Sequence, residues 1–133
     1  MCIFCKIVNG ECPSYKIYEN EDTYAFLSIA DEACGHTLVI PKKHYENVME
    51  IPQKEYNSVM ETVKKVSEHY TQNCGYTGVN IMNASGKDAQ QSVFHLHFHI
   101  LPRKENDGLD TWPKLDKANS DFEKVCKELS FDD

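Results

Sequence analysis

The chain has 133 residues and a formal net charge of −7, with charged residues mixed along its length. Its length suits one compact domain, and its acidic balance argues against a surface that grips a nucleic-acid backbone, because such a surface needs a positive footprint. No apolar run is long enough for a membrane span and the first residues lack the features of a signal peptide, so we expect a cytoplasmic protein that binds neither nucleic acid nor a membrane.

The first part of the chain predicts a short helix followed by three strands. The helix or turn spans residues 2–9. Residues 15–18 and 23–29 are rich in aromatic and β-branched residues and are separated by a polar turn, which indicates a hairpin. Residues 37–40 form a continuous apolar run that Pro41 ends, which is typical of a buried strand.

The middle of the chain predicts one long helix and two more strands. Apolar side chains recur every three or four positions through residues 53–73, which places them on one face of a helix. Residues 78–83 alternate as a strand, and residues 94–101 alternate between histidine and apolar residues. Strands joined by short turns, together with one long helix, predict an antiparallel α+β domain.

The chain ends in a polar stretch and a terminal helix. Residues 103–119 are polar and predicted to be irregular. Ser120 and Glu123 have the spacing of a capping box, which starts a helix. The apolar stripe of this helix consists of Phe122, Val125, Cys126 and Leu129. We expect one domain over residues 1–103, with residues 104–133 as a C-terminal extension that packs on the same domain.

Three histidines share one face of the last predicted strand of the sheet. His95, His97 and His99 are two residues apart, so their imidazoles project in the same direction. The opposite, apolar face carries Phe94, Leu96, Phe98 and Ile100. Imidazole is a metal ligand and also a nucleophile near neutral pH, so the three rings suit a metal ion or a phosphate group. Alternatively, the three histidines have no function and lie on a strand face that is exposed to solvent.

Two other segments fit a site around these histidines. Residues 83–92 lead into the strand and are rich in small and hydrogen-bonding side chains, as in a loop that cradles an oxyanion. His36 opens the buried strand after Gly35, where it can orient a catalytic imidazole. A polar surface loop and a hydrogen-bonded core histidine are the simpler interpretations of these two features.

The histidine run and its flanking segments resemble the histidine triad superfamily, whose signature is His-φ-His-φ-His-φ-φ with φ an apolar residue. The signature is found at residues 95–101, and the similarity extends to residues 3–7, 35–44 and 91–94 within a region of roughly residues 2–103. Within the superfamily the chain looks like the nucleoside phosphoramidase-like branch. The resemblance implies a five-stranded antiparallel sheet with one long helix and a short N-terminal helix, in a homodimer whose two sheets join.

The resemblance implies a nucleotide hydrolase or transferase. Such enzymes cleave nucleoside phosphoramidates and related nucleotide conjugates, here of a purine nucleotide, at the α-phosphorus through a covalent nucleotidyl-histidine. By position, His97 is the nucleophile and His99 contacts the phosphate oxygens. Asn83 and Ser92 hydrogen-bond the phosphate or the leaving group, and His36 belongs to the shell around the triad. This chemistry requires no catalytic metal.

The resemblance also implies a nucleotide-binding pocket. The apolar positions that enclose the base and the sugar are Phe4, Ile7, Phe26, Ile29 and Leu38. Ser28 stands where many members carry an aspartate that holds the ribose hydroxyls, and a serine cannot offer two anionic acceptor oxygens. Gln91 and Ser92 match the nucleotide-binding segment before the triad, although the loop that precedes them is one residue longer and lacks the usual glycine.

Six cysteines are present, and two of them form the motif Cys2-x-x-Cys5. In a reducing compartment such a pair is more often a metal clip or a redox pair than a structural disulfide. A closed tetrahedral zinc site needs two further ligands. The resemblance to bacterial members implies that His44 and His95 supply them, which gives a structural zinc held by Cys2, Cys5, His44 and His95.

Two other functions stay open from the sequence. His95, His97 and His99 together could bind one catalytic metal, in a metal-dependent hydrolase that chelators would inactivate. Alternatively, Ser28 and the longer loop fit a non-catalytic nucleotide-binding dimer, which would bind nucleotide tightly without turning over any conjugate.

Overall fold

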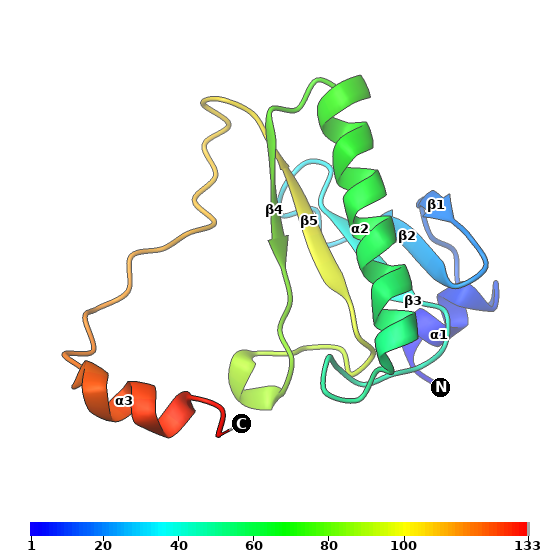
Figure 1. Ribbon diagram of the computed structural model, residues 1–133. Coiled ribbons are helices and arrows are strands. Elements are labelled where there is room, and N and C mark those ends of the chain that lie inside the picture. The colour runs from blue at the N-terminus through cyan, green and yellow to red at the C-terminus, as the bar shows by residue number, and fades with distance from the viewer. Residues whose placement is uncertain (133) are drawn as a thin grey trace.

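The computed structural model describes residues 1–132 and contains one antiparallel sheet with the strand order β1-β2-β3-β5-β4 (Figure 1). The strands are β1 (Lys16–Glu19), β2 (Thr23–Leu27), β3 (Thr37–Pro41), β4 (Gly78–Met82) and β5 (Phe98–Arg103). The helices are α1 (Ile3–Val8), α2 (Gln53–Asn73), α3 (Phe122–Leu129) and the short 3-10 helix η1 (Lys87–Ala89). These elements confirm the predicted α+β fold, with a five-stranded antiparallel sheet, one long helix, a short N-terminal helix and an appended C-terminal helix.

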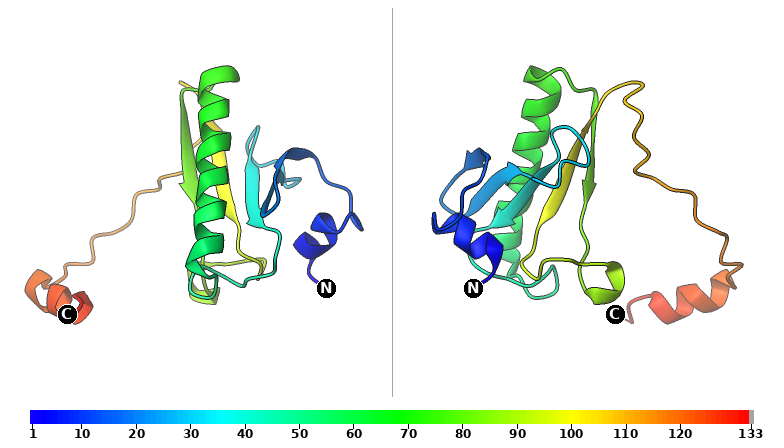
Figure 2. Two further views of the ribbon diagram at one scale, coloured as in Figure 1. Left: turned by 45° about the vertical axis from the view of Figure 1, so that its right-hand side comes forward. Right: turned by 180° about the vertical axis from the view of Figure 1, so that it is seen from behind.

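Alternation along the strands gives the sheet two apolar faces. On the face covered by α2, Val59 and Val63 of the helix belong to one core cluster with Val39 of β3. On the opposite face, Phe4 of α1 belongs to a second cluster with Leu38 of β3. Successive side chains of a strand point to opposite faces, so β3 contributes to both clusters. Figure 2 shows α2 and α1 on the two sides of the sheet.

The strand that carries the histidines begins later than predicted. β5 starts at Phe98 rather than at residue 94, because Phe98 is the first residue of this segment that pairs with β3. The backbone N–H of Leu96 donates instead to the loop after β3, to the carbonyl of Tyr45 at 2.7 Å. The side chains still alternate, since Leu96 packs in the cluster under α2. Phe94 lies before β5 and is 44% exposed, so it does not belong to the core cluster under α2.

The segment that follows β5 is tied to the sheet by one arginine. The guanidinium of Arg103 donates to four partners, which are Asn80 of β4, Asp107, the backbone carbonyl of Leu109 and the hydroxyl of Thr111. Thr111 donates in turn to the side chain of Asn80 at 2.7 Å. These hydrogen bonds hold residues 104–111 against the sheet edge formed by β4.

The terminal helix α3 lies apart from the sheet (Figures 1 and 2), and none of its residues is buried. Its N-cap is Asp121, whose carboxylate accepts from the backbone N–H of Lys124, so the predicted cap at Ser120 is wrong by one residue. The large apolar residues exposed in the tail are Trp112, Leu115, Phe122, Leu129 and Phe131. The boundary at residue 103 and the packing of the whole extension stay predictions. Within residues 1–132, no helix combines the length and the apolar character that crossing a membrane requires.

Candidate functional site

A cavity of about 480 Å³ opens on the face of the sheet that carries α1, and we call it the α1 cavity. It lies between α1, the strands β2 and β3, and the histidine segment. Its lining includes the predicted base and sugar positions and all four predicted catalytic positions. These residues are Phe4, Ile7, Phe26, Ser28, Ile29, His36, Leu38, Ser92, His97 and His99. Of the predicted nucleotide-binding residues, Asn83 and Gln91 do not line it.

The imidazole of His97 is held at the wall of this cavity in one tautomer. Its Nδ1 lies 2.9 Å from the backbone carbonyl oxygen of His95, and a carbonyl only accepts, so Nδ1 carries the proton and Nε2 carries the lone pair. The ring of Phe4 meets this imidazole at a steep angle, with ring centroids 5.2 Å apart. His97 is only 5% exposed, and burial lowers its pKa below the ordinary value for histidine. The ring is therefore neutral at neutral pH.

His99 and His36 form a second pair of rings beside His97. Nε2 of His36 and Nδ1 of His99 are 2.8 Å apart, so one ring donates a hydrogen bond to the other. The ring centroids of His97 and His99 are 4.9 Å apart. Burial, with the neighbouring His97 and His36, lowers the pKa of His99 to about 4. Burial also lowers the pKa of His36, although the carboxylate of Glu32 opposes that shift.

Asn83 holds the backbone of His97. Its Nδ2 donates to the carbonyl oxygen of His97 at 3.0 Å, and its Oδ1 accepts from the hydroxyl of Ser85 at 2.7 Å. The amide is therefore oriented from both ends, and one of its two N–H groups is left for a ligand. Asn83 lines a neighbouring cavity rather than the α1 cavity.

Gln91 is buried and holds the loop before the histidines. Its Nε2 donates to the carbonyl oxygens of Glu46 and Val93, at 2.7 and 3.0 Å. Its Oε1 accepts from the backbone N–H of Gly86 at 2.8 Å. Both ends of the amide are used by the backbone, so Gln91 positions the loop, and this placement gives no support to the predicted contact with nucleotide.

The four predicted zinc ligands lie close together at the start of α1, and they are Cys2, Cys5, His44 and His95. Their ligand atoms all lie within 4.8 Å of one another. The four distances between a cysteine sulfur and a histidine Nδ1 range from 3.4 to 3.6 Å. A sulfur and a nitrogen bound to one tetrahedral zinc, at about 2.3 and 2.0 Å from it, are about 3.5 Å apart. The donor set and its spacing therefore fit a closed structural zinc site.

The backbone of β3 orients His95 toward this cluster. Nε2 of His95 lies 2.9 Å from the carbonyl oxygen of Pro41, so Nε2 is the hydrogen-bond donor. Nδ1 therefore keeps its lone pair, on the side of the ring that faces the sulfurs of Cys2 and Cys5. Both ring nitrogens are thereby engaged. His95 is consequently not available to an ion held by His97 and His99, and this arrangement does not bring the three imidazoles to one metal.

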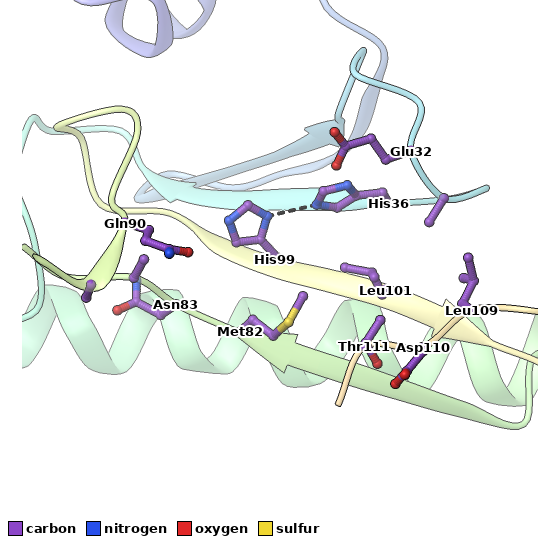
Figure 3. Close-up of a pocket in the computed structure, with 13 residues that line it drawn as sticks. Glu32, His36, Met82, Asn83, Gln90, His99, Leu101, Leu109, Asp110 and Thr111 are labelled. Atoms are coloured by element: carbon purple, nitrogen blue, oxygen red, sulfur yellow. Dashed lines mark hydrogen bonds between the residues drawn. The ribbon is translucent and has the colours of Figure 1, made fainter. Parts of the chain in front are cut away.

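Glu32 is a site residue that the sequence interpretation missed. It lines the α1 cavity, and its carboxylate lies near His36 (Figure 3). It belongs to the irregular segment between β2 and β3, where neither a strand pattern nor a motif marks it. An acidic side chain four positions before His36 was the one available signal.

Comparison with known proteins agrees with this geometry. The HIT domain family matches residues 9–106. An uncharacterized HIT-like protein of Methanocaldococcus jannaschii is 46% identical over 129 residues, which cover 97% of this chain and 98% of the relative. An adenosine 5′-monophosphoramidase of Candida albicans is 38% identical over 139 residues, with coverage of 97% of this chain and 91% of the relative.

One solved structure with the same fold is itself zinc-bound. It is a zinc-bound histidine triad family protein from Mycobacterium smegmatis, which matches with a TM-score of 0.78 at 34% identity and covers 86% of this chain and 84% of that chain. The family match extends over most of the chain, and the three histidines, the sheet and the cysteine-histidine cluster agree with it. The chain belongs to the HIT, or histidine triad, family.

Proposed function

We propose that this HIT protein cleaves a purine nucleoside phosphoramidate, or a related nucleotide conjugate, at the α-phosphorus through a covalent nucleotidyl-His97. The observation that carries the proposal is the fixed tautomer of His97, whose Nδ1 donates to the carbonyl of His95. The lone pair on its Nε2 is left to attack phosphorus beside His99. The similarity to the Candida albicans adenosine 5′-monophosphoramidase supports this substrate class.

In the first step, Nε2 of His97 forms a bond to the α-phosphorus and the phosphorus–nitrogen bond to the leaving amine breaks. The electron pair of the broken bond stays on the amine nitrogen, which takes up a proton from solvent. The positive charge that forms on the imidazole is stabilised by the hydrogen bond from Nδ1 to the carbonyl of His95.

In the second step, water attacks the same phosphorus and the bond to His97 breaks. The water releases its protons to solvent, the nucleotide leaves, and Nε2 recovers its lone pair. Another acceptor, such as an alcohol or an amine, takes the place of water in a transfer reaction. Both steps use the same imidazole and the same phosphate position.

His99 is proposed to stabilise the phosphoryl oxygens. It can donate from Nε2 when its Nδ1 accepts the hydrogen bond from Nε2 of His36, which lies 2.8 Å away. This arrangement needs both rings to be neutral, and the lowered pKa values of His36 and His99 favour that state. Ser92, at the rim of the α1 cavity, supplies a further hydroxyl donor.

We also propose that Cys2, Cys5, His44 and His95 hold a structural zinc. With four protein ligands the ion has no open position for water, so it supplies folding energy rather than a reaction step. It would link α1 to the loop after β3 and to the histidine segment. Phe4 lies between the two cysteines in sequence and contacts His97, so the zinc would also fix one wall of the α1 cavity.

The homodimer implied by the sequence is part of the proposal. β4 is an edge strand, and the apolar tail residues between 112 and 131 are exposed in a single protomer. Contact with a second copy would remove this apolar surface from water. Light scattering on the purified chain should give the mass of a dimer, and the mass of one chain would contradict it. A cytoplasmic location, expected from the sequence, stays a prediction.

Turnover of adenosine 5′-phosphoramidate by His97→Ala tests the catalytic proposal. We expect a loss of about a thousandfold or more with an unchanged circular dichroism spectrum. His69→Ala, on the exposed side of α2, is the matched control and should keep wild-type turnover. Retained turnover in His97→Ala would contradict the proposal.

The two alternative functions give different outcomes. Tight nucleotide binding by the wild-type chain without turnover of any conjugate would indicate a non-catalytic dimer. Loss of turnover on chelation without unfolding would favour a metal-dependent hydrolase.

A further inference from the structure

A second cavity, of about 450 Å³, adjoins the α1 cavity on the same face of the sheet (Figure 3). The two cavities share three lining residues, which are Glu32, His36 and His99. The α1 cavity extends from this boundary over β2 and β3, and the second cavity extends over β5 and β4. A phosphorus atom at this boundary can therefore direct one of its substituents into the α1 cavity and another into the second cavity.

The lining of the second cavity is apolar at its floor and acidic at its sides. Met82, Leu101 and Leu109 supply apolar surface. Glu32 and Asp110 are the charged side chains of the lining, and no lysine or arginine belongs to it. In Figure 3 Glu32 lies beside His36, and Asp110 lies across the cavity on the segment that carries Leu109 and Thr111.

Neither of these carboxylates is neutralised by an ion pair within residues 1–132. Glu32 takes part in no salt bridge there, and the side chain of Asp110 accepts only from the backbone N–H of Trp112, at 3.1 Å. Arg103 lies close enough to Asp110 for the two charges to interact, but its guanidinium is held by two hydrogen bonds to Asp107 and forms no salt bridge with Asp110. The second cavity therefore presents two carboxylates that have no salt-bridge partner within the described residues.

The wall that carries Asp110 is fixed. Arg103 donates to the carbonyl oxygen of Leu109 at 2.6 Å and to the hydroxyl of Thr111 at 2.8 Å, on either side of Asp110. The same arginine is anchored to β4 through Asn80 at 2.8 Å. This network links the residues on both sides of Asp110 to the edge strand β4.

We propose that the second cavity receives the leaving group, and that Glu32 and Asp110 select amines that carry an additional positive charge. The inference rests on the proposed function, since it places the nucleoside in the α1 cavity and phosphorus at the boundary near His97 and His99. An alkyl diamine or a basic amino acid linked through nitrogen to phosphorus fits the apolar floor and the acidic sides. A sulfate, phosphate or carboxylate in the leaving group meets like charge there.

Three adenosine 5′-phosphoramidates that differ only at the far end of the leaving amine test the inference. They are made from 1,4-diaminobutane, butylamine and 4-aminobutanoic acid, and carry a positive, a neutral and a negative end. The same bond breaks in each, and each leaving group is an unhindered primary alkylamine. We expect kcat/KM to decrease in that order, by about fivefold per charge step at low salt, and the spread to narrow in about 0.5 M NaCl.

Variants of the two carboxylates test whether they cause the preference for a positively charged leaving group. Glu32→Gln and Asp110→Asn should each lower the ratio of kcat/KM for the diamine substrate to that for the butylamine substrate, and the double variant should bring it close to one. Glu105→Gln, which removes an exposed carboxylate outside both cavities, is the matched control and should keep the wild-type ratio. Circular dichroism checks that each variant is folded.

The outcomes separate the inference from the function on which it rests. Turnover of all three substrates at equal kcat/KM, or a ratio that the double variant leaves unchanged, would overturn the charge selection while the proposed function stands. No turnover of any of the three would contradict the proposed function itself.

Discussion

The backbone carbonyl of His95 accepts a hydrogen bond from Nδ1 of His97 at 2.9 Å, while the ring of His95 faces the sulfurs of Cys2 and Cys5. His95 therefore contributes its side chain to the proposed zinc site and its backbone to the proposed nucleophile. The two sites are two residues apart in the same segment. We therefore expect a change at the proposed metal site to alter the orientation of His97.

Loss of a metal ligand should lower stability and weaken nucleoside binding. For Cys5→Ser we expect a decrease in zinc content and a decrease in Tm of about 5–10 °C. KM should rise more than kcat falls, because Phe4 and Ile7 of α1 line the α1 cavity. Calorimetry, metal analysis and steady-state kinetics measure the three effects.

Cys126→Ser is the control for the metal prediction, because Cys126 is an exposed cysteine of α3. It should match the wild-type protein in zinc content and in Tm. A Cys5→Ser variant with unchanged zinc content and Tm would contradict the proposed zinc site.

Ser28→Asp should strengthen the recognition of ribose. Ser28 lines the α1 cavity, and its backbone N–H donates to the carbonyl of His36 at 2.8 Å, so its backbone is held next to the segment that leads into β3. A carboxylate there offers two anionic acceptors to the ribose hydroxyls, so KM for an adenosine phosphoramidate should fall about tenfold. The 2′,3′-dideoxy analogue is the control and should show no such gain. An equal change for both substrates would contradict a ribose contact.

The sequence predicted the elements that depend on local pattern. The helix expected over residues 53–73 coincides with α2, because its apolar face repeats through its whole length. The buried strand expected over residues 37–40 is β3, with Pro41 as its last residue. The cavity residues carried over from the family also came together, because they lie on α1, on β2, β3 and β5, or in the segments next to these strands.

Features that depend on contacts between distant segments were not predictable. The start of β5 depends on where β3 pairs with it, and the alternating residues before Phe98 contain no information on that limit. Gln91 looked like a ligand contact because its three backbone partners lie in loops whose path the sequence does not specify. Glu32 reaches the site only because the irregular segment before β3 folds back over His36.

Stability should fall as the pH is lowered from about 6.5 toward 4. The pKa of His99 is about 4 in the folded chain and about 6.5 in an unfolded chain. Between these values the unfolded chain binds a proton that the folded chain does not, so the free energy of unfolding decreases as the pH falls. His99→Asn should therefore show a smaller decrease of Tm over this interval.

The control for this pH prediction is the same pair of proteins at pH 8, where the imidazole is neutral in both states. Any difference in Tm there reports packing rather than protonation. A decrease of Tm between pH 6.5 and 4 that is equal in the wild-type protein and in His99→Asn would contradict the lowered pKa of His99.

The covalent intermediate is the most direct test of the catalytic role of His97. Wild-type protein mixed with an adenosine phosphoramidate and quenched within one turnover should gain the mass of one adenylyl group, and peptide mapping should locate it on His97. His97→Ala treated in the same way should gain no mass. Turnover without any adduct on the wild-type protein, or an adduct on another residue, would contradict this account.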